Sequence, residues 1–65
     1  MPSSVIRDID YQPEAHRLLV RFVSGALYAY EPVPEAVYRG FREAGSKGRF
    51  FSRKVRDRYA FRRLD

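Results

Sequence analysis

A chain of 65 residues is long enough for one domain, and the absence of cysteine excludes disulfides and thiolate metal sites. Its five Tyr and five Phe must therefore supply much of the core of so small a domain. The formal net charge is +5, and no apolar run approaches the roughly 20 residues of a membrane span. The first residues lack the features of a signal peptide, so a cytoplasmic location is expected.

The basic charge is concentrated in the second half of the chain. Residues 1–36 contain three basic and five acidic residues, whereas residues 37–65 contain ten basic and three acidic residues. Such asymmetry favours an acidic partner, most often nucleic acid.

Residues 4–11 are the first predicted strand. Val5, Ile9 and Tyr11 share one parity, whereas Ile6 has the other, a pattern compatible with a β-bulge.

Two further strands are predicted at 17–23 and 26–31, joined by a two-residue hairpin turn at Ser24-Gly25. Together with the first strand they predict a three-stranded antiparallel sheet. The face expected to hold the core carries Leu18, Val20, Phe22, Tyr28 and Tyr30. Tyr28 and Tyr30 could instead form a stacking platform for bases, but core is the favoured interpretation.

The first predicted helix covers 34–44, with Pro34 in its first turn and Gly45 as its C′ residue. Its outer face is close to neutral, because oppositely charged residues alternate at i,i+4 spacing. These pairs are Glu35–Arg39 and Arg39–Glu43.

The second predicted helix covers 47–58, with Ser46 as its N-cap. Phe51, Val55 and Tyr59 form its apolar stripe. At about 100° per residue, three arginines fall within an arc of about 60° opposite that stripe. These are Arg49, Arg53 and Arg56. The contrast between a balanced helix and a basic helix is the sharpest functional signal in the sequence.

The segment after residue 60 is either a short last strand or a tail packed on the sheet, because Phe61 and Leu64 stand among arginines. The expected architecture is thus an α+β domain, 1–65, with both helices on one face of the sheet.

The residues that could carry chemistry are few. His16 has no partner at the spacing that catalysis or metal binding needs. Asp8 and Asp10 share a strand face and could hold a divalent cation, but the polar face of an edge strand explains them as well. Gly45-Ser46-Lys47-Gly48 lacks the spacing of a phosphate loop. Neither an enzymatic activity, nor a cofactor, nor a metal is therefore expected.

Three joined motifs resemble the KTSC domain, which is named for the C-terminus of some lysyl-tRNA synthetases. They are L-x-V-x-F-x-x-G-x-x-Y-x-Y from Leu18, V-P-x-x-V-Y-x-x-F-x-x-A from Val33 and S-x-G-x-F-F from Ser46. Gln12 and Ser52 depart from the family pattern, which tends to have Asp and Asn there. The resemblance covers about 4–60 and implies no catalytic residues, but it suggests a role beside RNA.

The favoured function is non-specific binding of RNA or other nucleic acid, with Arg49, Arg53 and Arg56 on phosphates. Auxiliary contacts are expected from Lys47, Arg62 and Arg63. The alternative is a protein-interaction module, which would bind an acidic partner or add a strand at a sheet edge.

Overall fold

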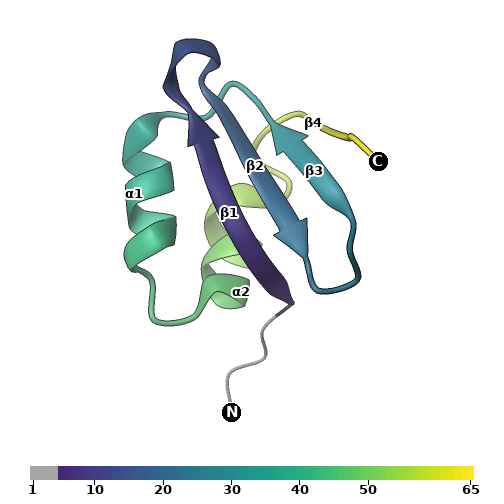
Figure 1. Cartoon of the computed structure of the whole chain (residues 1–65). Coiled ribbons are helices and arrows are strands. Elements are labelled where there is room, and N and C mark those ends of the chain that lie inside the picture. Colours follow the sequence, from purple (N-terminus) through teal and green to yellow (C-terminus); the bar gives the residue numbers. More distant parts are fainter. Residues whose placement is uncertain (1–4) are drawn as a thin grey trace.

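A four-stranded antiparallel sheet carries the helices on one face in the computed structural model, which describes residues 5–65 (Figure 1). The strands, in spatial order, are β1 (Ile6–Gln12), β2 (Arg17–Phe22), β3 (Leu27–Tyr30) and β4 (Phe61–Arg63). The helical segments are the 3-10 turn η1 (Pro13–Ala15), α1 (Glu35–Glu43), α2 (Lys47–Phe50) and the π-helical η2 (Phe51–Val55). Within residues 5–65, no helix is long and apolar enough to cross a membrane. The α+β class is confirmed, but the prediction of three strands is wrong by one.

The additional strand is the C-terminal segment, for which the sequence left strand or tail open. β4 pairs antiparallel with β3, placing Phe61 opposite Tyr30 and Arg63 opposite Tyr28. The pairing is extended by the Leu64 N–H, which donates to the Leu27 carbonyl at 2.8 Å. Three residues are too few to show the alternation that identifies a strand in sequence. Residues 61–63 form a strand because they pair with the free edge of β3.

The β-bulge that the sequence indicated in β1 is confirmed. Ile6 pairs with Phe22 of β2, but Asp8 pairs with Arg21, so Arg7 is the extra residue. The bulge brings Ile6 to the covered face of the sheet, where it is buried. Val5, on the other side of the bulge from Ile9 and Tyr11, is 47% exposed. Residue 4 of the predicted strand lies outside the described residues.

The hairpin between β2 and β3 is one residue longer than predicted. The Phe22 N–H donates to the Ala26 carbonyl, and the Gly25 N–H donates to the Phe22 carbonyl, both at 2.9 Å. These bonds close a three-residue loop in which Gly25 has φ = 99°, a conformation that favours glycine.

The core lies between the sheet and the two helices, on the face that the sequence predicted. Leu18 and Val20 of β2 are completely buried, as are Phe41 of α1 and Val55 of η2. Tyr30 is buried beside them, whereas Phe22 and Tyr28 are only half-buried.

Helix α1 agrees with its predicted range to within a residue at each end, but it does not end as expected. Gly45 does not take the left-handed conformation of a C′ glycine. Instead, Ala44 turns to an extended conformation and the Lys47 ammonium donates to the carbonyls of Arg42 and Ala44, at 3.0 and 3.4 Å. This lysine satisfies carbonyls that the helix end leaves free.

The second helix is shorter than the predicted 47–58. Ser46 caps it as expected, since its hydroxyl accepts from the Arg49 N–H at 3.3 Å. The helix then widens into a π turn, in which the Arg56 N–H donates to the Phe51 carbonyl at 2.8 Å. It ends at Val55, and Asp57 has φ = 64°, so the chain leaves the helix axis there.

Replacing Phe41 with alanine should destabilise the domain by about 3–5 kcal/mol, because this completely buried ring also stacks on Phe50. Phe22→Ala should cost less, since Phe22 is only half-buried. Urea unfolding of the two variants checks this order. An equal cost for both would mean that the sheet side of the core is packed more tightly than the structure indicates.

Candidate nucleic-acid interface

Four basic residues of α2, η2 and the position after η2 are exposed and have no acidic partner among residues 5–65. Arg49, Arg53, Lys54 and Arg56 all face solvent, and none forms an ion pair with any of residues 5–65. Guanidinium groups without a carboxylate partner keep their hydrogen-bond donors free for an external anion.

The outer face of α1 has paired charges, unlike the basic face of the second helix, but only one of the two predicted ion pairs forms. Arg39 pairs with Glu35 at 3.3 Å, whereas the second predicted pair, Arg39–Glu43, does not form within the described chain. Arg42 lies over the ring of Tyr38 at 5.6 Å. The arginines of α1 thus have partners within the domain, unlike those of α2 and η2.

The three arginines predicted to share one arc are divided between two hollows. Arg49 and Arg53 line a hollow of about 280 Å³ between the end of α1 and the start of the second helix, together with Phe50 and Lys54. Arg56 follows the last residue of η2 and lines a second, larger hollow. The three arginines would share one arc only on a regular helix that continued to residue 58. The helix ends at Val55, so Arg56 does not share that arc.

The predicted auxiliary residues have different surroundings. Lys47 is half-buried and donates to carbonyls at the end of α1. Arg62 pairs with Ala29, so its side chain leaves the sheet on the face opposite the helices. Arg63 donates to the Asp65 carboxylate at 3.1 Å, and this hydrogen bond raises the pKa of Arg63 above its usual value.

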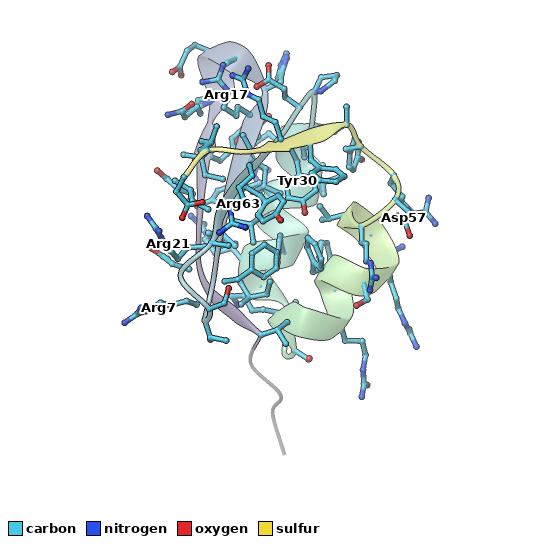
Figure 2. The ribbon with its side chains drawn as sticks, turned by 90° about the vertical axis from the view of Figure 1, so that its right-hand side faces the viewer. Arg7, Arg17, Arg21, Tyr30, Asp57 and Arg63 are labelled. Atoms are coloured by element: carbon cyan, nitrogen blue, oxygen red, sulfur yellow. The ribbon has the colours of Figure 1, made fainter. Side chains whose placement is uncertain are left out.

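The larger hollow, called here the aromatic hollow, has a volume of about 670 Å³. It opens between the β2–β3 hairpin, β4 and the segment after η2; in Figure 2, Tyr30 lies between Arg63 on one side and Asp57 on the other. The ring-bearing residues that line it are Phe22, Tyr28, Tyr30, Phe51 and Phe61. Its charged residues are Arg56, Asp57 and Arg63.

Phe61 is the most exposed of these aromatic residues. Its ring lies 5.7 Å from that of Tyr28 and 5.5 Å from that of Tyr30, yet 60% of the residue is exposed. Phe61 was not among the residues predicted to form a site, although the sequence carries one signal, an apolar residue amid the arginines of the tail. The core interpretation favoured for the tyrosines holds for Tyr30, which is buried, and Tyr28 packs against the core; both residues also line the hollow.

The aspartates of β1 bond to their own strand. The carboxylate of Asp8 accepts from the Ile9 N–H, and that of Asp10 from the Tyr11 N–H, each at 2.9 Å. By the register of β1 with β2, these two N–H groups point away from the sheet. The carboxylates therefore occupy the free donors of an edge strand.

His16 is exposed and closes η1 in a left-handed conformation, with φ = 50°. Within residues 5–65, no group of three His, Asp or Glu side chains is arranged to hold a metal ion.

These features define a small α+β domain with a basic helical segment and an adjoining aromatic hollow. A family profile described as the KTSC domain matches residues 2–59, and the chain belongs to this family. The crystal structure of a KTSC domain protein from Yersinia pestis has a TM-score of 0.90 and 33% identity, covering all of this chain and 94% of its own.

Two relatives differ in how much of their length this chain covers. An uncharacterized protein of Stutzerimonas stutzeri is 42% identical over 66 residues, which span this whole chain and 93% of the relative. A lysine–tRNA ligase of Nostoc punctiforme is 33% identical over 61 residues, which span 94% of this chain but 11% of the ligase. The same domain thus makes up nearly all of one relative and a small part of another.

Titration with Mg²⁺, Mn²⁺ or Zn²⁺ should produce no saturable shift in the amide signals of β1, because Asp8 and Asp10 already accept hydrogen bonds from their neighbours. Two-dimensional NMR of the wild-type protein provides the measurement. Micromolar binding that disappears in Asp8→Asn/Asp10→Asn would show that the two carboxylates form a metal site.

The Tyr30 hydroxyl should make stability fall at high pH. Burial, more than the charges around it, raises the pKa of Tyr30 from 10.0 to about 12. Between these values the unfolded chain has lost the proton and the folded chain has kept it, so the free energy of unfolding decreases as the pH rises. Tyr30→Phe should lose less stability than the parent from about pH 10 to 12 in urea unfolding. Parallel losses in the two proteins would assign the effect to other groups.

Proposed function

We propose that this domain binds nucleic acid, RNA in particular, through phosphate contacts of the basic segment formed by α2 and η2. The observation that carries the proposal is the group of exposed arginines that have no acidic partner within residues 5–65, Arg49, Arg53 and Arg56. Phosphate contacts of this kind bring affinity without sequence preference. The kinship with a region of a protein named as a tRNA ligase supports RNA as the partner.

The geometry supports phosphate more than a protein carboxylate. Arg49 and Arg53 line the same hollow, together with Phe50, so two arginines border one concave surface. A polyanion with regularly spaced charges can engage both, and continue to Arg56 beyond the end of η2.

Strand addition at a sheet edge, the other possibility that the sequence left open, is less well supported. At β1, the carboxylates of Asp8 and Asp10 occupy outward N–H groups that an added strand would need. At the other edge, β4 has only three residues, two of which are arginines.

The test compares two double charge reversals, Arg49→Glu/Arg53→Glu and Arg39→Glu/Arg42→Glu, which change the net charge equally. The first should abolish binding to single-stranded RNA at about 50 mM salt, whereas the second should weaken it only modestly. Fluorescence anisotropy with a labelled oligonucleotide supplies the affinities. Because all four arginines are exposed, both variants should retain the circular dichroism spectrum of the parent.

Salt dependence gives an independent check. Three to five phosphate contacts predict that log K falls against log salt with a slope of roughly −0.7 per contact on single strands. Binding should then be micromolar at low salt and nearly absent above about 0.3 M.

Two outcomes would contradict the proposal. Equal losses of affinity in the two charge-reversal variants would mean that net charge alone drives binding. No binding of the parent to RNA or DNA would favour a protein partner.

A further inference from the structure

We propose that the aromatic hollow binds one unpaired base of a single-stranded nucleic acid, stacked on Phe61, with the adjacent phosphates on Arg56 and Arg63. This inference rests on the proposed function and adds to it a preference for single strands. It assigns a role to aromatic side chains such as Phe61, which the charge pattern of the sequence does not identify.

Phe61 is placed as a stacking surface would be. Its backbone is fixed by pairing with Tyr30 in the sheet, and its ring rests against the rings of Tyr28 and Tyr30. More than half of the residue nevertheless remains exposed, a costly arrangement for a phenylalanine in water. Exposed aromatic rings on a sheet are the usual platforms for unstacked bases, because every base has a π-face.

The volume of the hollow suits a small flat ligand. At about 670 Å³ it falls within the range of roughly 300–1,000 Å³ typical of small-molecule sites. A base within a duplex is already stacked between its neighbours and cannot enter, so only an unpaired base can use the hollow.

The charges around the hollow complement a nucleotide. Arg56 is exposed and has no ion pair within residues 5–65, and Arg63 lies on another wall, held beside the hollow by Asp65. Asp57 is the one acidic residue among those that line it. Phosphates on either side of an inserted base would thus meet guanidinium groups from two separate elements.

A hydrogen-bonding group is also available at the base of the hollow. The Tyr30 hydroxyl donates to none of the described residues, and its electrostatic neighbours Tyr28, Arg56 and Asp57 all line the hollow. A tyrosine hydroxyl with a pKa of 10.0 or above keeps its proton at neutral pH, so Tyr30 can donate to an acceptor on a base edge.

The decisive comparison measures Phe61→Ala against single-stranded and duplex RNA of the same sequence by fluorescence anisotropy. Affinity for the single strand should fall about 5- to 100-fold, the range expected for one lost stacking contact, while affinity for the duplex stays unchanged. Leu64→Ala is the matched control, since Leu64 is another exposed apolar residue of the same tail, at 44%, and does not line the hollow. It should bind both forms like the parent.

Phe61→Tyr separates stacking from support of β4. The tyrosine ring can still stack, so this variant should retain single-strand affinity, and the amide signals of Arg62 and Leu64 report whether β4 stays paired. Direct titration with adenosine 5′-monophosphate should shift the ring signals of Tyr28 and Phe61. No such shift, or equal losses on single strand and duplex in Phe61→Ala, would overturn the base-binding hollow.

The outcomes also distinguish this inference from the proposal beneath it. If Arg49→Glu/Arg53→Glu abolishes binding and Phe61→Ala changes nothing, the phosphate interface stands and the base site is wrong. If the parent binds neither single-stranded nor duplex nucleic acid, both are wrong.

Discussion

The packing of Phe51 against the sheet is the contact on which the rest of the structure depends. Its ring meets Phe22 edge-on at 5.4 Å and Tyr30 at 5.7 Å, and it also lies 6.5 Å from Phe41 of α1. One side chain therefore joins both helices to the strands. With Phe51 and Val55 directed inward, the intervening Arg53 and Lys54 face solvent. The basic surface is therefore a consequence of the way Phe51 and Val55 pack this short helix against the sheet.

The same contact links stability to the candidate site. Phe22, Tyr30 and Phe51 form both part of the core packing and the inner wall of the aromatic hollow. Substituting any of them would change folding and binding together, because each contributes buried aromatic area. The outer wall is different, since Phe61 and Arg56 are exposed. Function can be separated from stability only there, and in a domain without disulfides that separation matters.

Sequence reasoning succeeded where a periodic pattern was long enough to identify a face. Leu18 and Val20 marked the covered side of the sheet, and Phe41 and Val55 marked the helix faces that pack on it. It failed at features that depend on contacts distant in sequence. β4 has three residues and takes its register from β3, and the hollow combines residues from the hairpin, three strands and the helix end. The π turn was also missed, because it interrupts a pattern that reads as a regular helix.

Neither edge of the sheet favours a partner that binds by adding a strand. Asp8 and Asp10 occupy the outward donors of β1, and the short β4 carries Arg62 and Arg63, both devices that discourage pairing between sheets. The proposed nucleic-acid partner would then contact the basic segment and the hollow beside it. Arg56 stands where these two surfaces meet, because it follows the end of η2 and lines the hollow. In the binding mode proposed above, a single strand that crosses the end of η2 would pass from phosphate contacts to the stacking site at Arg56, whereas a rigid duplex could make only the first of these contacts.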